Sequence, residues 1–507
     1  METEIELKFF VRPDFSEKLR RKIAEVKTLQ NSCRELGNIY FDTQDNWLRE
    51  HDIGLRIRRF DEVYVQTVKT SGRVVAGLHQ RPEYNAEHSS NSPDLTLHPK
   101  DIWPPGKDFS ELQHDILPIF STNFTREQWL VSMADGSQIE VAFDQGVVVA
   151  GDKESPICEV ELELKSGQAD SLFTLARSLS EEGGMRLGNL SKAARGYRLA
   201  QGYEGDEVKP LALVETKSED SVEVCFVNSL EHALSHWHFH EQIYFEHPSN
   251  QVLAQISNSI SFIRQILTVY GGIVPRRASA LLRQELKWLD EELSWLKTAD
   301  YIDDLCEDKG HALRKLDARK VLVNKLIKSK EALPTQDDMI TLFTSARYTG
   351  LLLDLSRWLM GRGWHPFLDE KAKEKMANPV KRFSQYQLDR TWAELIEAFP
   401  PHTALTRYEY IEQRYGLMRN LYTGICFASV YDIDQRNNFR MPWDDLLHGI
   451  DDLLTLRPLE ELINHKELDE EDRGQLERWL ARQEASILHA MEQTRAMSIE
   501  VQPYWSS

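Results

Sequence analysis

Charged and apolar residues alternate with a period of two through most of the strand-forming segments in the first 200 residues. In the opening segment METEIELKFF, the charged residues Glu4, Glu6 and Lys8 occupy alternate positions and the residues between them are apolar. Because successive side chains of a strand point to opposite faces, this pattern predicts a strand with one charged and one apolar face. Further strands are predicted over residues 36–43, 53–60, 63–69, 73–84, 122–133, 137–150 and 157–164.

Short turn sequences join several of these strands as neighbours, at Ser71-Gly72, Asp135-Gly136 and Gly151-Asp152. A series of about eight strands joined in this way is typical of an antiparallel meander or barrel. An amphipathic stretch over residues 14–29 opens with Pro13-Asp14 and predicts a helix after the first strand.

Two arrangements would account for the charged faces of the strands. If these faces meet water, the apolar faces form the core of an ordinary small barrel. If helices cover an apolar outer surface, the charged faces line an interior tunnel, and opposite charges or a ligand must offset their desolvation. The basic residues of such a tunnel would be Lys8, Arg56, Arg58, Lys69, Arg81 and Arg126, with Lys192 near its mouth. The acidic residues would be Glu4, Glu6, Glu83, Glu140, Asp144, Glu159, Glu161 and Glu163.

The two signs of charge suit a polyanion that carries its own divalent cations. Arginine and lysine bind phosphate oxygens, and carboxylates bind hard metals such as Mg²⁺ or Mn²⁺. The chain has 61 basic and 81 acidic residues, and the net charge of -20 would repel nucleic acid. An anionic ligand therefore needs the local basic cluster or bound metal, and the pattern indicates a metal-dependent phosphate enzyme.

A different pattern follows an acidic, turn-rich stretch over residues 203–220, which we interpret as a linker. From residue 221 onward the apolar residues follow the period of amphipathic helices, most clearly between Leu281 and Leu289. Helices are predicted over residues 222–245, 251–270, 276–296, 312–332, 337–360, 380–399, 403–427 and 475–494. We therefore expect an α+β protein with a strand-rich domain over residues 1–202 and a helical bundle over residues 221–507.

Composition narrows the setting in which the chain works. No apolar run approaches the roughly 20 residues that span a bilayer, and the charged N-terminus lacks the apolar stretch of a signal peptide. We therefore expect a cytoplasmic protein without a membrane partner. The five scattered cysteines predict reduced thiols rather than a disulfide framework or a zinc site.

Four histidines lie close together at His232, His236, His238 and His240. The first two have the i, i+4 spacing that can bind a metal on one helix face. No convincing set of cysteine or carboxylate ligands accompanies them, so histidines that are solvated or satisfied within the protein are the favoured interpretation.

Six segments of the chain carry a resemblance to a known family. They are Glu4-x-Glu6-x-Lys8, Leu55-Arg56-Ile57-Arg58, Thr67-Val68-Lys69, Arg81-x-Glu83, Glu159-x-Glu161-x-Glu163 and the run from Ser191 to Tyr197. Together they resemble the CYTH family, also called triphosphate tunnel metalloenzymes, and within it the bacterial inorganic triphosphatases that carry a C-terminal CHAD domain. The resemblance implies an eight-stranded antiparallel tunnel that binds a linear triphosphate with divalent metal. It also implies that the second half is a bundle of two similar four-helix halves, proposed to bind polyphosphate.

The helical half departs from the usual CHAD pattern, a histidine followed by several arginines at helical spacing. The corresponding stretch, residues 259–270, keeps only Arg264. Other basic residues are Arg276, Arg277, Arg283, Lys381, Arg382, Arg390, Arg407, Arg414 and Arg419. A groove for long-chain polyphosphate and a solvated helix surface explain these charges equally well.

The favoured hypothesis is hydrolysis of inorganic triphosphate to diphosphate and phosphate, with Glu4, Glu6 and Lys8 as catalytic residues. The expected ligands of one or two Mg²⁺ or Mn²⁺ ions are Glu4, Glu6, Asp144, Glu161 and Glu163. Lys8 would steady a phosphate oxygen or orient water, and no protein nucleophile is required. Hydrolysis of thiamine triphosphate, cyclisation of ATP and non-catalytic polyphosphate binding stay open. The absence of an evident aromatic platform for a base favours bare triphosphate.

Overall fold

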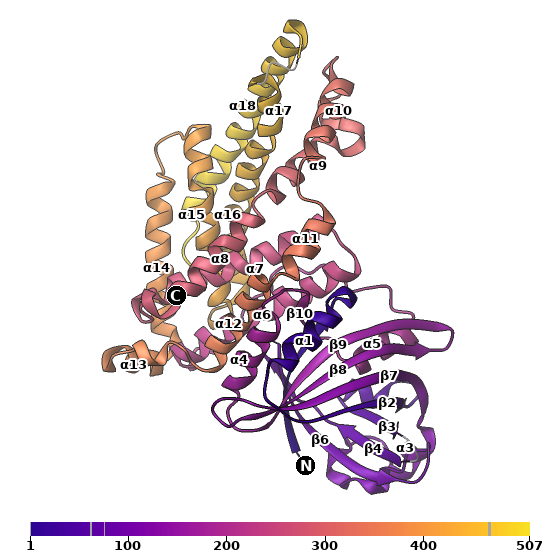
Figure 1. The fold of residues 1–507 in the computed structure, drawn as a ribbon. Helices are drawn as coiled ribbons and strands as arrows, with labels where there is room; N and C mark the ends of the chain where they lie inside the picture. The colour runs from indigo at the N-terminus through magenta and orange to yellow at the C-terminus, as the bar shows by residue number, and fades with distance from the viewer. Residues whose placement is uncertain (1, 61–62, 76, 465–467, 507) are drawn as a thin grey trace. The chain divides into compact units, whose positions relative to one another are not determined.

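The computed structural model describes residues 2–60, 63–75, 77–464 and 468–506. The chain forms two compact units. The first comprises Met1–Asp206 together with Met339–Arg362, and the second comprises Glu207–Asp338 and Gly363–Ser507. The named strands all belong to the first unit (Figure 1).

Eight antiparallel strands close into a barrel in the first unit, which confirms the expected fold. They are β1 (Glu2–Val11), β2 (Thr28–Asp42), β3 (Gly54–Phe60), β4 (Val63–Lys69), β6 (Leu78–His88), β7 (Leu117–Ser132), β8 (Gln138–Ala150) and β9 (Lys153–Ser166). Their order is β1-β9-β8-β7-β2-β3-β4-β6, and pairing of β6 with β1 closes the ring. Two short strands extend it, β5 (Arg73–Val75) beside β6 and β10 (Met185–Leu187) beside β1.

Helices cover apolar faces on the outside of the barrel. The helix α4 (Asp170–Leu179) contacts β1, β9 and the helix α1 (Ser16–Ala24), and the strands bury Leu7 and Leu162 completely. The short helices α2 (Trp47–Glu50) and α3 (Phe109–Asp115) contribute to a second core that includes Leu55 and Val68. Each fully buried side chain of this kind contributes about 1.5–3 kcal/mol. Because the apolar faces are used in this way, the charged faces of the strands turn toward the barrel interior.

The helix predicted over residues 14–29 is too long. A 3-10 turn at Pro13–Phe15 leads into α1, which ends at Ala24, and β2 already begins at Thr28. Thr28 pairs with Val131 near the far end of β7, so the long β2–β7 ladder takes the residues that local periodicity assigned to the helix. A further helix, α5 (Lys192–Ala200), follows the barrel and packs on β7, β8 and β9.

The second unit is helical. Its helices are α6 (Val222–Glu246), α7 (Asn250–Val269), α8 (Ala280–Glu292), α9 (Leu296–Gly310), α10 (Arg319–Lys330), α13 (Glu370–Ala377), α14 (Val380–Ala398), α15 (Arg407–Cys426), α16 (Ile433–Thr455), α17 (Arg457–Asn464) and α18 (Glu470–Glu500). The predictions missed α9, α13, α16 and α17. Among the described residues, no helix combines the length and apolarity needed to cross a membrane. All five cysteines are free thiols.

The helix predicted over residues 337–360 is two helices, α11 (Gln336–Phe343) and α12 (Ala346–Met360). The side chain of Ser345 accepts a hydrogen bond from the backbone N–H of Tyr348 and so starts α12 as its N-cap. Residues 339–362 belong to the same unit as the barrel. There α12 contacts α4 and β10, and the buried hydroxyl of Thr349 donates to the carbonyl of Met185 at 2.6 Å.

Part of the predicted linker lies along α6 within the second unit, where the histidine cluster binds its backbone. Nε2 of His232 is 2.8 Å from the carbonyl oxygen of Ala212, and Nε2 of His236 is 3.1 Å from that of Lys209. Nε2 of His240 accepts a hydrogen bond from the N–H of Lys209 at 3.2 Å. Burial lowers the pKa of His236 to about 4, and His240 adds to the effect. These three histidines are therefore satisfied by the protein, as expected.

Candidate active site in the barrel

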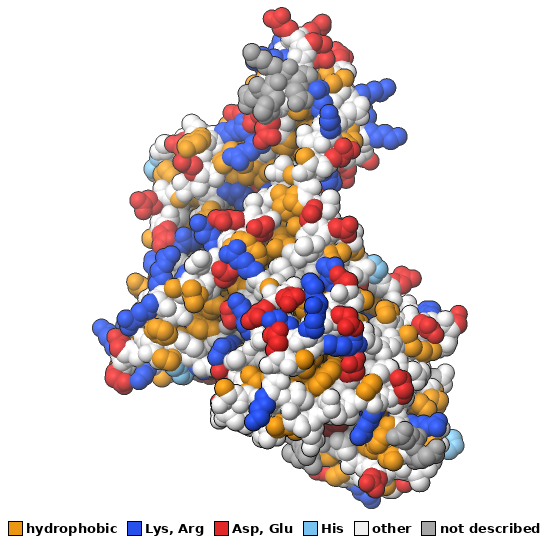
Figure 2. Space-filling view, viewed as in Figure 1, with side chains coloured by type: hydrophobic (Ala, Val, Ile, Leu, Met, Phe, Trp, Pro, Cys, Tyr) orange, Lys and Arg blue, Asp and Glu red, His pale blue; other side chains and the backbone are white. Residues whose placement is uncertain are grey.

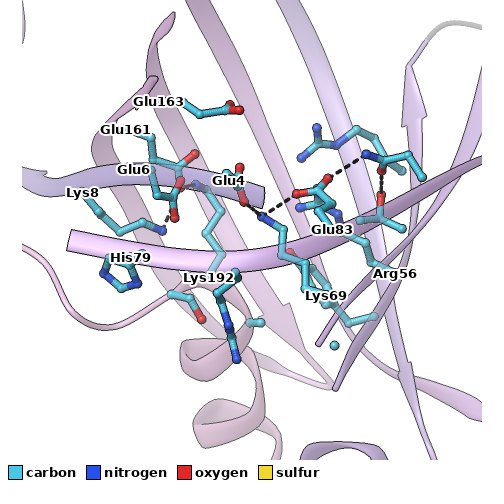
Figure 3. A pocket seen from close by; sticks show the side chains of 18 of the residues that line it. Glu4, Glu6, Lys8, Arg56, Lys69, His79, Glu83, Glu161, Glu163 and Lys192 are labelled. Carbon is cyan, nitrogen blue, oxygen red and sulfur yellow. Dashed lines mark hydrogen bonds and ion pairs between the residues drawn. The ribbon is translucent and has the colours of Figure 1, made fainter. Parts of the chain in front are cut away.

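A cavity of about 730 Å³ lies inside the barrel and is lined by charged side chains (Figure 3). The predicted residues among its lining are Glu4, Glu6, Lys8, Arg56, Arg58, Lys69, Arg81, Glu83, Arg126, Glu140, Glu161, Glu163 and Lys192. The other two predicted residues, Asp144 and Glu159, are fully buried and lie beside the cavity in ion pairs with several of these groups.

Strand alternation and register bring the predicted side chains together. On β1 and β9, Glu6 lies opposite Glu163 and Lys8 lies opposite Glu161. The same alternation places Arg56 and Arg58 of β3 on one face, because residues two apart on a strand share a face. Charges from distant parts of the sequence therefore converge in one cavity.

Lys192 reaches this cavity from the start of α5. The side chain of Ser191 caps the helix by accepting from the N–H of Ala194 at 3.0 Å. Gly196 lets the helix approach β7, because a Cβ there would lie 2.1 Å from the ring of Phe120. The ammonium of Lys192 then lies 2.6 Å from a carboxylate oxygen of Asp144.

Asp144, Glu159 and Glu161 form an acidic cluster whose ligand atoms all lie within 4.8 Å of one another. Lys192 contacts all three, and Arg126 holds both oxygens of Asp144 at 2.7 Å. The remaining pairs are Arg126–Glu161 at 2.7 Å, Lys8–Glu161 at 2.7 Å, Lys8–Glu159 at 3.2 Å and Arg195–Glu159 at 2.6 Å. Side chains of the protein thus already neutralise this cluster.

The pKa of Glu161 reflects this compensation. Burial alone would raise it, but Lys192, Lys8 and Arg126 hold the pKa of Glu161 well below its usual range. Desolvation would lower the pKa of Lys8, but the charges of Glu159, Glu161 and Glu6 outweigh this effect and raise the pKa of its ammonium. A raised pKa favours the protonated form of Lys8, which suits it to donating hydrogen bonds rather than to acting as a base.

A second acidic group, Glu4, Glu6 and Glu163, has less positive charge around it. Burial raises the pKa of Glu4, and the ammonium of Lys69 at 2.5 Å offsets only part of that effect. Burial also raises the pKa of Glu6, and the charge of Glu161 raises it further. Burial likewise raises the pKa of Glu163. These three carboxylates therefore form the part of the cavity in which added positive charge is most favourable.

Two arginines that line the cavity, Arg58 and Arg81, also have pKa values shifted against their charged forms. Burial lowers the pKa of Arg58 to about 9, with Arg56 and Arg126 adding to the effect. Burial also lowers the pKa of Arg81. Within the described chain, Nε of Arg56 is buried without a hydrogen-bond partner. An anion placed here would supply both the missing charge and the missing acceptor.

Two family models match the chain, the CYTH domain over residues 2–197 and the CHAD domain over residues 228–455. We refer to the two matched regions as the CYTH domain and the CHAD domain.

A curated relative matches part of the chain under a more specific name. An inorganic triphosphatase of Haemophilus influenzae is 42% identical over 197 residues, which are 39% of this chain and 54% of that protein. The match therefore spans about half the length of this curated relative.

Two solved structures are similar over one domain each. The CHAD domain from the plant Ricinus communis is 19% identical, covers 57% of this chain and 97% of that one, and has a TM-score of 0.44. HpAC1 from Hippeastrum, a candidate adenylyl cyclase described as having a dominant triphosphatase activity, is 15% identical. That match covers 39% of this chain and 96% of that one, with a TM-score of 0.29.

The cavity of the CYTH domain also contains residues that the sequence did not single out: Tyr40, Arg49, Asp52, His79, Asn85 and Lys165. Thr67 and Tyr197, which belong to the motifs that carry the resemblance, line it as well. Tyr40 could have been found from strand alternation, because it shares a face with the polar residues Asn38 and Asp42, and the structure places it opposite Arg56. Arg49 and Asp52 lie on and after the short helix α2, where no strand periodicity marks a side chain as inward-facing.

The rings of Tyr40 and Tyr197 line the cavity, and their contacts bear on the expectation that the cavity has no evident aromatic platform for a base. Tyr40 stacks on Phe120 with ring centroids 4.5 Å apart. Tyr197 donates its hydroxyl to the buried carboxylate of Asp42 at 2.8 Å, and its ring lies 5.5 Å from the guanidinium of Arg49. Both rings therefore already have partners within the CYTH domain.

Proposed function

We propose that the CYTH domain hydrolyses inorganic triphosphate to diphosphate and phosphate, with Mg²⁺ or Mn²⁺ as cofactor. The observation that carries this proposal is that one cavity contains both carboxylates and arginines whose charged forms lack sufficient opposite charge nearby. Within the same cavity, burial disfavours the charged forms of the carboxylates Glu4, Glu6 and Glu163 and of the guanidinium groups of Arg58 and Arg81. A phosphate chain with a divalent cation supplies both missing charges at once.

The carboxylates available to a metal have the chemistry that Mg²⁺ and Mn²⁺ prefer, because oxygen ligands suit hard cations. We assign the metal to Glu4, Glu6 and Glu163, and we assign Asp144 and Glu159 to holding the buried cations. A metal at Asp144, Glu159 and Glu161 would have to displace the Lys192 ammonium, which contacts all three. When bound, the cation would neutralise phosphate oxygens and act as a Lewis acid.

The residues of the chain would bind and orient the substrate rather than form a covalent intermediate. Arg56, Arg58 and Arg81 would hold phosphate oxygens through charge-assisted hydrogen bonds. Lys8 would donate to an oxygen of the phosphate under attack, because its ammonium is fixed by Glu159 and Glu161. Water would be the nucleophile, and diphosphate would leave.

Bare triphosphate is favoured over triphosphates that carry a base or a thiamine ring. Tyr40 and Tyr197, the aromatic side chains of the cavity, already contact Phe120, Asp42 and Arg49. The name of the Haemophilus influenzae relative, an inorganic triphosphatase, also supports this choice. The same fold acting on thiamine triphosphate or ATP, and a polyphosphate-binding protein without activity, are the alternatives.

The test is phosphate release from inorganic triphosphate, ATP, thiamine triphosphate and diphosphate by the full chain, each with Mg²⁺, with Mn²⁺ and with EDTA. We expect triphosphate to be cleaved far faster than the other three, and only with metal. Equal rates on ATP would make the protein a nucleotidase. If the protein binds triphosphate with metal but releases no phosphate, it is a binding protein without catalytic activity.

For the CHAD domain we propose binding of long-chain polyphosphate through exposed basic residues. Arg264, Arg407 and Arg414 each pair with a carboxylate and are less available. The exposed candidates are Arg276, Arg277, Lys381 and Arg382. On the face in Figure 2, lysine and arginine side chains on the helical unit lie among aspartates and glutamates. Because contacts between exposed basic residues and phosphate are electrostatic, binding should weaken as salt rises.

A further inference from the structure

The chain contains one charged motif twice, and the two copies lie side by side in the barrel. Residues 4–8 read Glu-Ile-Glu-Leu-Lys and residues 161–165 read Glu-Leu-Glu-Leu-Lys. They lie on the antiparallel neighbours β1 and β9, with Glu6 opposite Glu163. An antiparallel pair has a local two-fold axis between its strands, so the two copies run in opposite directions from that central pair.

This symmetry makes Lys165 the counterpart of Lys8. Lys8 lies opposite the first glutamate of the second copy, Glu161, at 2.7 Å. Continued two residues beyond the last recorded pair, Glu6–Glu163, the same register would place Lys165 opposite the first glutamate of the first copy, Glu4. The two lysines therefore lie on opposite sides of the central glutamates, and both line the cavity.

The two lysines differ in how firmly they are held. The side chain of Lys8 is 4% exposed and contacts two buried carboxylates. The side chain of Lys165 is 39% exposed, with its ammonium 2.7 Å from Glu163 and 3.9 Å from Glu140. Lys165 also lies at a register shift between β8 and β9, and such bulges change the direction of a side chain. Lys8 is held by two buried carboxylates, whereas Lys165 is more exposed and has one close carboxylate partner.

Lys165 neutralises a carboxylate that we assign to the metal. The bound divalent cation would bring two positive charges close to its ammonium, and the ion pair with Glu163 would then lose its advantage. The long, flexible lysine stem allows the ammonium to move to another anion. The nearest anion that arrives with the metal is the phosphate chain.

We propose that Lys165 competes with the metal for Glu163 and, once displaced, binds a terminal phosphate on the side of the cavity opposite Lys8. This inference rests on the proposed function and deepens it. A linear triphosphate has the same end-to-end symmetry as the strand pair, so each end would meet one lysine. Lys165 is therefore a further substrate-binding lysine, and it becomes available to the phosphate chain only when the metal is bound.

The test measures metal binding and substrate binding separately in the full chain with Lys165→Met. Direct Mn²⁺ titration without substrate, followed by electron paramagnetic resonance, should show binding about three- to tenfold tighter than in the unmodified protein. At saturating Mn²⁺, the KM for triphosphate should rise about three- to tenfold with little change in kcat, because a binding contact is lost. Lys165→Arg should keep both values close to those of the unmodified protein.

Lys153→Met is the matched control, since Lys153 is an exposed lysine at the other end of β9 that does not line the cavity. Unchanged Mn²⁺ affinity in Lys165→Met would overturn the competition with metal. Tighter Mn²⁺ binding with an unchanged KM would overturn the phosphate contact. An unmodified protein that binds no Mn²⁺ at all would instead refute the proposed function itself.

Discussion

Replacing Asp144 by asparagine and Glu6 by glutamine should separate the two acidic groups of the barrel. Asp144 is fully buried and bonded to both Arg126 and Lys192. Asparagine keeps its size but leaves two buried cations without this carboxylate, and breaking a buried ion pair costs about 3–5 kcal/mol. At about 2–4 °C per kcal/mol for a domain of this size, we expect the melting temperature to fall by about 6–20 °C.

Glu6→Gln should have the opposite profile. Burial and the charge of Glu161 already disfavour the ionised form of Glu6, so a neutral replacement removes an unfavourable charge from the metal-free protein. We expect its unfolding free energy to stay within about 1 kcal/mol of that of the unmodified chain. Affinity for Mn²⁺ should fall at least about tenfold, because a ligand is lost.

The assays are thermal unfolding followed by circular dichroism and Mn²⁺ titration of the metal-free proteins. Asp14→Asn is the control for both, because this carboxylate is exposed and pairs only with the nearby Arg12 among the described side chains. The reasoning is refuted if Asp144→Asn loses Mn²⁺ affinity as strongly as Glu6→Gln while its melting temperature stays unchanged. The metal would then belong at Asp144, Glu159 and Glu161.

Three further predictions concern pH, a buried hydroxyl and the division of the chain. Burial raises the pKa of Glu4, Glu6 and Glu163, so their contribution to metal-free stability is present below the unfolded pKa and lost as pH rises through the folded pKa. Metal must displace the same protons, so Mn²⁺ affinity measured by titration should rise with pH over that range, and a flat profile would contradict the ligand assignment. Tyr197→Phe should lower the unfolding free energy by about 1–3 kcal/mol in urea denaturation, because Asp42 loses a hydrogen bond, and no loss would show that water replaces the hydroxyl. A protein ending at Gly202 should keep metal-dependent triphosphatase activity if it stays folded, but should melt earlier than the full chain because it lacks α12, which covers α4 and β10. The segment from Ser221 to Ser507 should release no phosphate from triphosphate, and folded, triphosphate-binding but inactive truncated protein would show that the helical half completes the active site.

Much of the barrel could be predicted because strand alternation is a local property. Glu4, Glu6 and Lys8 share a face in any extended chain, and so do Glu159, Glu161 and Glu163. Charged faces this regular leave few options, since a buried charge needs an opposite charge or a ligand. The side chains predicted from this pattern accordingly line the cavity or contact those that do.

The errors occurred where a partner distant in sequence changed the outcome. Residues 28 and 29 have a helical pattern, yet their pairing with β7 makes them part of a strand. Arg49 reaches the cavity from α2, where the carboxylate of Asp42 accepts hydrogen bonds from the backbone N–H groups of Leu48 and Arg49. The carboxylate of Asp42 in turn depends on Tyr197, far along the chain. No local periodicity reports such contacts.

The sequence by itself determined which residues could face the interior, because the two faces of a strand are set by the covalent chain. It could not determine which of the interior carboxylates are neutralised by the protein's own cations and which stay available to a metal. Asp144 and Glu163 are both acidic residues on inward-facing positions, but only the folded barrel places Lys192 and Arg126 against Asp144 and leaves Glu163 beside the more exposed Lys165. The energy of a buried charge depends on the distances to all its neighbours, and these distances exist only once the barrel has closed.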